Sequence, residues 1–209
     1  AQPCRYQYAL VEEKRPGEYF PIGEDAGGAF ILNSRDMCMI DHVPELMDAG
    51  LDSLKIEGRA KSAYYAAIVT AAYRHAIDAA QAGEPLDPVW RAEVDKVSHR
   101  PYSTGFYYGE PGQHTAHARY LRDWQVVGVV TSCAPDGAAL CELRNKFAEG
   151  DELELVGPGV RPVSFRVEGL ADGDGLPIPE ARKPQMPFRL RLPVQAPPLS
   201  LLRRKAVGL

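Results

Sequence analysis

The sequence has no long apolar run and no export signal at its start. No stretch approaches the roughly 18 to 20 apolar residues that a membrane-spanning helix needs. The first residues contain neither a methionine nor a basic segment followed by an apolar one. We therefore expect a soluble cytoplasmic protein that has no membrane partner.

A strong charge of either sign is also missing. The formal net charge is −4, with 45% hydrophobic and 25% charged residues. This composition is typical of a globular protein and gives no global attraction to DNA or to acidic membranes. Any contact with RNA must therefore come from a local basic face.

Cysteines are few, and their spacing matches no zinc finger. Cys133 and Cys141 flank an Asp-Gly turn and could face each other across a hairpin, but without a secretory context we expect small core residues and not a disulfide. Cys4 and Cys38 each lie beside an arginine, and two thiolates cannot complete a tetrahedral metal site. From the residues alone, structural roles are favoured for all four.

The signatures of common hydrolases are absent as well. The chain has no His-Glu-x-x-His zinc string and no Ser-His-Asp order. Ordinary peptide hydrolysis needs an activated nucleophile or a water-activating metal, and neither is visible here.

The residues that are present divide the chain into three regions of different texture. In residues 1–85, strands alternate with helices, which predicts the C-terminal βα units of a TIM-like barrel. Residues 86–120 form a connector, and residues 121–209 carry short strand patterns separated by glycine turns, which predict a small antiparallel β-barrel domain. The fold class is thus α/β plus all-β.

The first region has several distinct local signals. Residues 5–23 predict a hairpin around Pro16-Gly17, and residues 29–32 predict a buried strand. Cap residues at 33–36 predict a short helix that carries Cys38. Further signals predict a helix over 44–49 that stops at Gly50, a strand over 53–57, and a long helix from Ser62 to a stop at Gly83.

The connector and the tail are predicted in the same way. Residues 88–97 predict a helix, and the aromatic, glycine-rich residues 99–109 predict either a binding loop or a packed strap between domains. In the tail, strands are expected over 126–132, 138–143, 152–156, 163–167 and 188–194.

One short segment has the pattern of an active site. Glu57 ends the predicted strand, Arg59 offers a planar fork for a carboxylate or phosphate, and Lys55 and Lys61 add positive charge. Catalytic groups of parallel barrels lie at the carboxyl ends of strands, so Glu57 and Arg59 are the catalytic candidates. The alternative is an Arg-Glu ion pair that closes the rim of the barrel.

Several long strings resemble the collagenase-like peptidase family, peptidase U-thirty-two. The resemblance covers roughly residues 1–110, and the β-rich tail resembles the C-terminal domain of that family. It adds Tyr64, Arg100 and Tyr102 to the candidate substrate-binding residues, together with Lys55 and Lys61. The strings lie at residues 4–19, 33–38, 48–50, 53–65 and 100–106.

The resemblance implies a cofactor that the residues alone do not. Relatives of the family hold a 4Fe-4S cluster through four cysteines, and Cys4 and Cys38 fall where the last two would lie. The family signature that would precede Cys4 is missing, so we expect an N-terminally truncated fragment, inactive alone; a processed N-terminus is the alternative.

The resemblance also implies two different activities. Some bacterial members are linked to oxygen-independent hydroxylation of transfer RNA wobble uridine, with prephenate as the implied hydroxyl source, whereas the family name implies proteolysis. An iron–sulfur cluster suits hydroxylation, so RNA modification is the favoured prediction and a collagenase-like peptidase is the alternative.

The C-terminal tail is locally basic. Its positive residues could contact RNA phosphates, protect a solvated strand edge, or belong to a non-enzymatic assembly module. The set is Arg182, Lys183, Arg189, Arg191, Arg203, Arg204 and Lys205.

Overall fold

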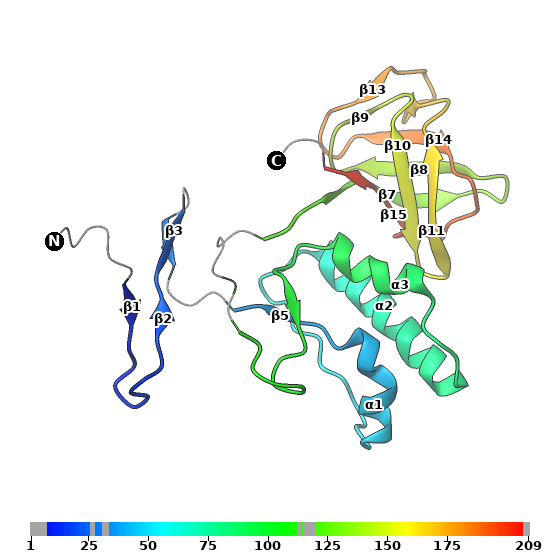
Figure 1. Ribbon diagram of the computed structural model, residues 1–209. Coiled ribbons are helices and arrows are strands. Elements are labelled where there is room, and N and C mark those ends of the chain that lie inside the picture. The colour runs from blue at the N-terminus through cyan, green and yellow to red at the C-terminus, as the bar shows by residue number, and fades with distance from the viewer. Residues whose placement is uncertain (1–7, 26–27, 31–33, 113, 115–119, 207–209) are drawn as a thin grey trace.

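The structure is a computed structural model that describes residues 8–25, 28–30, 34–112, 114 and 120–206. Figure 1 shows short strand pairs near the N-terminus, a group of helices in the middle and a strand-rich part at the C-terminal end.

The N-terminal strands form two small ribbons. β1 (Ala9–Leu10) pairs with β2 (Phe20–Pro21) in antiparallel register, and β3 (Gly23–Asp25) pairs with β4 (Gly28–Phe30). Gly17 in the connecting turn has φ +97°, a backbone conformation that glycine adopts without strain. The predicted hairpin is therefore confirmed, and the strand predicted over 29–32 overlaps β4 up to the undescribed residues.

The prediction of a short helix that carries Cys38 is wrong. β5 (Asp36–Met37) lies there instead and pairs in parallel with β6 (Tyr102–Ser103), and the N–H of Cys38 donates to the Ser103 carbonyl at 2.9 Å. The local capping pattern was overridden by pairing with a segment more than sixty residues away. A 3₁₀ helix, η2 (Ile40–His42), follows Cys38.

The helices follow the sequence signals closely. They are α1 (Val43–Asp48), α2 (Ala63–Ala82), α3 (Pro88–Glu93) and the 3₁₀ helix η3 (Val94–Lys96). The Ser62 hydroxyl accepts a hydrogen bond from the N–H of Tyr65 at the start of α2, and Gly83 ends this helix at φ +67°. Both predicted boundaries of the long helix are confirmed.

The TIM-like barrel stays a prediction. Within the described residues, β5 and β6 are the one parallel strand pair, and the strand expected over 53–57 is not part of any sheet. A strand needs a neighbour for its backbone hydrogen bonds, and no described segment pairs with 53–57.

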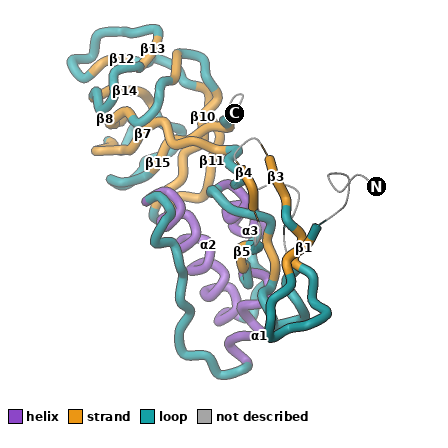
Figure 2. The backbone as a smooth tube through the Cα atoms, turned by 90° about the vertical axis from the view of Figure 1, so that its left-hand side faces the viewer, coloured by secondary structure: helices purple, strands orange, loops and turns teal. Residues whose placement is uncertain are grey.

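The tail is one antiparallel sheet whose order is β11-β10-β15-β7-β8-β14-β12. Residues of β11 and β14 pack against the same core, so the sheet curls around it (Figure 2), yet in the described part of the chain no pairing joins β11 to β12. The predicted small antiparallel domain is confirmed, and closure of its sheet into a barrel is not seen among the described residues. A separate pair, β9 (Phe147–Ala148) with β13 (Glu180–Ala181), adds two short strands. The seven strands are β7 (Trp124–Cys133), β8 (Ala138–Leu143), β10 (Glu152–Gly157), β11 (Val160–Arg166), β12 (Ala171–Asp172), β14 (Pro187–Arg191) and β15 (Leu201–Lys205).

The two tail cysteines do not face each other. Cys133 is opposite Ala139 and Cys141 is opposite Val130, and both thiols are free. Burial raises the pKa of Cys141 to about 12, so its thiol is inert in the core. The expected core role is confirmed for Cys141, while Cys133 is only half-buried.

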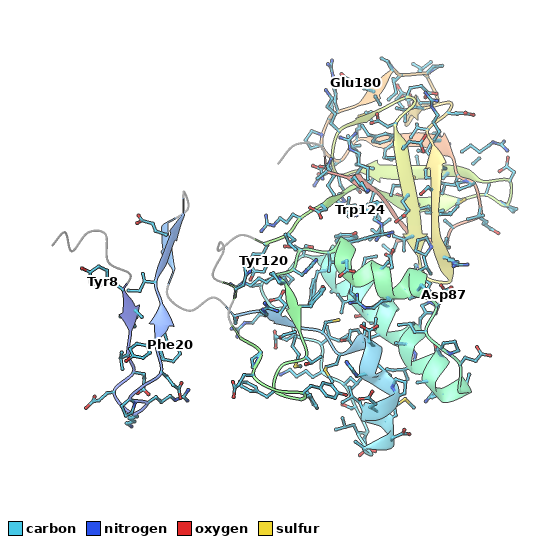
Figure 3. The ribbon with its side chains drawn as sticks, viewed as in Figure 1. Tyr8, Phe20, Asp87, Tyr120, Trp124 and Glu180 are labelled. Atoms are coloured by element: carbon cyan, nitrogen blue, oxygen red, sulfur yellow. The ribbon has the colours of Figure 1, made fainter. Side chains whose placement is uncertain are left out.

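A buried charge network joins the helices to the sheet. Arg203 of β15 is completely buried and donates to Glu93 of α3 at 2.6 Å, to Glu154 of β10 from Nε at 2.8 Å, and to the Tyr64 hydroxyl at 3.0 Å. Lys96 lies 2.9 Å from both carboxylates. Trp124, labelled in Figure 3, lies beneath the two cations, with its ring centre 4.7 Å from Lys96 Nζ and 5.2 Å from the Arg203 guanidinium. We call Tyr64, Glu93, Lys96, Glu154 and Arg203 the domain-contact network.

Only Arg203 is removed from the basic face predicted for the tail, because the other predicted cations are exposed or half-buried. Arg203 is buried, and Arg204, Arg191 and Arg182 form ion pairs with carboxylates at 2.7, 3.2 and 3.1 Å. The alternative of a charge-protected edge is also wrong for residues 201–205, because β15 lies inside the sheet between β10 and β7.

Tyr64 gives the domain contact a pH dependence. Burial raises the pKa of its hydroxyl to about 12, against an opposing effect of Arg203. In the unfolded chain the phenol ionises near pH 10, so its stabilising contribution is full below pH 10 and is lost as the pH rises to about 12. The two-unit shift corresponds to roughly 2 to 3 kcal/mol.

We therefore expect Tyr64→Phe to flatten the fall in unfolding free energy between pH 10 and pH 12. Urea unfolding measured at several pH values tests this, with the exposed Tyr19→Phe as the control. A Tyr64→Phe profile as steep as that of the control would contradict the assignment.

Candidate functional site

A cavity of about 830 Å³ lies between the segment 51–61 and the helix α2. The segment leaves α1 at Gly50 and reaches the Ser62 cap of α2, with a turn closed by the Lys61 N–H and the Gly58 carbonyl at 2.8 Å. The Tyr65 hydroxyl donates to the Glu57 carbonyl at 3.4 Å and attaches the segment to α2. Lys55, Glu57, Arg59 and Lys61 all line this cavity. The structure thus brings four of the predicted site residues together.

The charged groups of the cavity differ in how firmly they are held. Lys61 is mostly buried: its Nζ donates to the Ser98 carbonyl at 2.8 Å and lies 3.4 Å from Asp36 and 3.9 Å from the centre of the Tyr120 ring. Lys55 and Glu57 are exposed and 3.9 Å apart, a separation at which a solvated pair contributes little. Lys61 is therefore positioned, whereas Lys55 is free to move.

Arg59 is not engaged in the rim ion pair considered from the sequence. Its backbone N–H donates to the Glu57 carboxylate at 3.1 Å, but across the described ranges its guanidinium forms no ion pair. Arg35 lines the same cavity and likewise forms no ion pair with a described carboxylate. Two planar, permanently charged groups are thus available for an anionic ligand.

Cys38 lies behind the cavity wall. Its half-buried thiol accepts a hydrogen bond from the Tyr73 hydroxyl at 3.9 Å, and that hydroxyl accepts from the Met39 N–H at 2.9 Å. Burial, together with the charge of Cys38, raises the pKa of Tyr73 above its ordinary value, so the phenol remains a donor to sulfur.

Cys4 and Cys38 are the residues predicted to bind an iron–sulfur cluster. Cys4 lies outside the described residues, and within them no three His, Cys, Asp or Glu side chains gather in a way that could hold a metal ion. A half-buried thiol with a phenol donor is compatible with one ligand of an iron–sulfur cluster, whose potential depends on hydrogen bonds to sulfur. The described residues do not form a complete site.

The other predicted substrate-binding residues lie outside the cavity lining. Tyr64 belongs to the domain-contact network, and the Tyr102 hydroxyl donates to the Val94 carbonyl at 2.5 Å. Arg100 donates to the Ser34 carbonyl at 3.2 Å, and its guanidinium packs at 5.0 Å on the ring of Tyr120, labelled in Figure 3. The same ring lies 3.9 Å from Lys61 Nζ. Sequence reasoning did not single out Arg35, Tyr65, Tyr73 or Tyr107, which line the cavity.

Residues 99–109 are packed in their first half and exposed in their second, and the binding role considered from the sequence stays a prediction. His99 is buried and its ring stacks on Tyr102 at 4.3 Å, so the first half of the segment is packed. Phe106, Tyr107 and Tyr108 in the second half are exposed. Only this second half is available for binding.

No helix in the described ranges combines the length and apolarity needed to cross a bilayer.

Comparison with known proteins gives a consistent family match. The sequence model of the family described as peptidase family U32 matches residues 1–117. The sequence model of the U32 C-terminal domain matches residues 122–203. A structure of the C-terminal domain of a Geobacillus thermoleovorans protein assigned to the U32 peptidases is 28% identical, with a TM-score of 0.37, and covers 38% of this chain and 99% of that chain.

Three curated relatives carry two kinds of name. A tRNA hydroxylation protein P from Escherichia coli is 37% identical, and the matched region covers 84% of this chain and 40% of that protein. A tRNA hydroxylation protein P1 from Bacillus subtilis is 31% identical, with 97% of this chain and 50% of that protein covered. A collagenase from Porphyromonas gingivalis is 29% identical, and the matched region covers 80% of this chain and 41% of that protein. The chain thus spans about half or less of the length of these relatives.

Proposed function

The chain belongs to peptidase family U32, and we propose that the protein containing it hydroxylates the wobble uridine of transfer RNA without molecular oxygen. The observation that carries this proposal is the similarity over most of the chain to two relatives named for tRNA hydroxylation. RNA is then the substrate, and the cytoplasm is the expected location.

The cavity supports the proposal chemically. Arg35 and Arg59 present guanidinium groups without carboxylate partners in the described chain, and Lys61 is fixed beside them. Such groups bind phosphates and carboxylates through charge-assisted hydrogen bonds. They suit both an RNA phosphate and a carboxylate-bearing hydroxyl donor, for which prephenate remains our prediction.

Glu57 is the proposed proton acceptor or donor of the cavity. It is exposed, follows Lys55 and Ile56 along the cavity wall, and accepts the Arg59 N–H, which orients its carboxylate. Arg59 is the proposed anion-binding partner. Together they place a titratable carboxylate and a fixed positive charge within the same turn of the chain.

Cys38, with Cys4, is the proposed pair of cluster ligands contributed by this chain. An iron–sulfur cluster would supply one-electron redox chemistry to the site when bound. Tyr73 would orient the Cys38 sulfur through its hydroxyl. The cluster itself remains our proposal.

We expect deletion of the complete gene to abolish hydroxylated wobble uridine, as measured by mass spectrometry of digested transfer RNA. Re-expression of the wild-type gene should restore the modified nucleoside, and Cys38→Ser should not. Unchanged hydroxylation in a strain without any paralogue would contradict the proposed function.

The relative named collagenase favours a second candidate, peptide hydrolysis. The purified protein can be incubated with gelatin beside its Glu57→Gln variant. Two results together would identify proteolysis as the function in place of hydroxylation. Gelatin cleavage by the wild type would be lost in Glu57→Gln, and the level of hydroxylated wobble uridine would be unchanged in the deletion strain.

A further inference from the structure

Large apolar side chains are exposed beside the cavity. Phe106, Tyr107 and Met37 have 76%, 58% and 61% of their surface exposed. They line a second cavity of about 610 Å³, together with Ser34, Arg35, Ser103, Gly105, Pro111 and Gly112. Large apolar side chains exposed around one cavity make it a candidate site of interaction. We call the two exposed aromatic residues, Phe106 and Tyr107, together with the neighbouring Met37, the aromatic platform.

The aromatic platform is held in place by specific contacts. Pairing of β5 with β6 sets Met37 opposite Ser103, and Gly105 at φ +61° lets the loop turn directly over Met37. Glycine adopts this φ without strain, and a Cβ atom at position 105 would lie 2.8 Å from the Met37 sulfur, so that the methionine side chain would have to move. The Tyr108 hydroxyl then bonds to Glu45 of α1 and lies 3.1 Å from His42 Nδ1, which fixes the far end of the loop.

The platform and the candidate active site form one groove. Arg35, Met37 and Tyr107 line both cavities. A ligand that lies on the aromatic platform therefore reaches the cavity of Glu57 and Arg59 without leaving the surface formed by these three residues.

The groove is positive although the chain is acidic overall. Its two linings contain four cations, namely Arg35, Lys55, Arg59 and Lys61, and two carboxylates, Asp36 and Glu57, against a formal net charge of −4 for the chain. Two exposed aromatic side chains, Phe106 and Tyr107, line one cavity with the Arg35 guanidinium, unpaired among the described residues, which suits a ligand that carries both bases and phosphates. A duplex keeps its bases stacked inside, so only unpaired nucleotides can use such faces.

We propose that the aromatic platform stacks unpaired nucleobases of a single-stranded RNA segment while Arg35 holds the adjoining phosphate. This inference names the substrate contact of the proposed function and rests on it. It assigns binding roles to Phe106, Tyr107 and Arg35, residues outside the proposed catalytic pair.

The test measures RNA binding by the protein that contains this chain, without any need for catalysis. The probe is a fluorescently labelled single-stranded oligouridine of eight nucleotides, compared with a blunt duplex of the same length by anisotropy. Phe106→Leu keeps the apolar volume but removes the π face, whereas Phe106→Tyr keeps the face. Tyr19, an exposed tyrosine of the β1–β2 hairpin, provides the control Tyr19→Leu.

We expect Phe106→Leu to weaken single-strand binding by about 5- to 150-fold, since a stacked base is worth about 1 to 3 kcal/mol. Phe106→Tyr and Tyr19→Leu should bind within about threefold of wild type, and the duplex should bind more weakly than the single strand. Wild-type affinity in Phe106→Leu, or equal affinity for the duplex, would overturn the proposal.

The outcome is separable from that of the proposed function. If deletion leaves wobble-uridine hydroxylation unchanged but Phe106→Leu loses single-strand binding, the platform stands and the assigned reaction fails. If hydroxylation depends on the gene but Phe106→Leu binds normally, the reaction stands and the platform fails.

Discussion

Replacing Arg203 with methionine is expected to lower the free energy of unfolding by about 3 to 5 kcal/mol. Arg203 is completely buried and, together with Lys96, bridges Glu93 of the helices to Glu154 of the sheet. Methionine has a similar length but no charge, so Glu93, itself fully buried, would keep only Lys96 as a partner. The cost arises because two buried carboxylates would share the single remaining cation, Lys96, and not from lost volume.

Unfolding in urea, followed by tryptophan fluorescence, measures this effect. Trp90 lies on α3 and Trp124 on β7, so the two tryptophans of the chain report on the helices and on the sheet. Arg189→Met is the matched control, because Arg189 is an exposed arginine of the same sheet that donates one hydrogen bond to the Gly173 carbonyl at 3.0 Å. It should change stability by less than about 1 kcal/mol.

A double variant separates charge compensation from packing. Arg203→Met combined with Glu93→Gln removes one buried negative charge together with its partner and should recover part of the loss. A single Arg203→Met variant that is as stable as Arg189→Met would show that the domain-contact network does not hold the two parts together.

Local signals in the sequence predicted the elements that depend on neighbouring residues. Ser62 and Gly83 mark the ends of α2 because a cap and a left-handed stop act within one turn of helix. The strands β7, β8, β10, β11 and β14 were predicted because glycine turns separate them at short intervals.

The failures all involve partners that are distant in the chain. Cys38 was placed on a helix because the pairing of β5 with residues 102–103 has no local signal. β15 was missed because Leu201–Lys205 contains three consecutive cations, and Arg203 could be recognised as buried only once Glu93 and Glu154 lay beside it.

The candidate site was predictable in part for the same reason. Lys55, Glu57, Arg59 and Lys61 lie on one short segment, so their gathering at one cavity needs only that segment. Arg35 and Tyr107 reach the same cavity through β5–β6 pairing, which no spacing along the chain reveals.

Arg59→Ala is expected to lower the rate of tRNA hydroxylation by about 100- to 1000-fold, the usual cost of removing one fixed positive or hydrogen-bonding group from a developing negative charge. The Arg59 guanidinium is exposed in the cavity, and within the described residues it forms no ion pair whose loss would destabilise the fold. The loss should therefore appear in activity and not in stability.

Arg59→Lys distinguishes charge from geometry. Lysine keeps the positive charge but lacks the planar fork that binds two oxygens of one anion, so its activity should fall between those of wild type and Arg59→Ala. Arg182→Ala, which removes an exposed arginine paired with Glu180 at 3.1 Å in the tail, should have no effect.

The measurement is the initial rate of hydroxylated-uridine formation, by mass spectrometry, in a deletion strain that expresses each variant at a limiting and equal protein level. Equal urea unfolding curves for wild type and Arg59→Ala establish that the fold is intact. Wild-type rates in Arg59→Ala under these conditions would remove Arg59 from the site. Because Glu57 is oriented by the Arg59 backbone N–H and not by its side chain, the alanine variant leaves the carboxylate in place, and the lost rate reports the guanidinium alone.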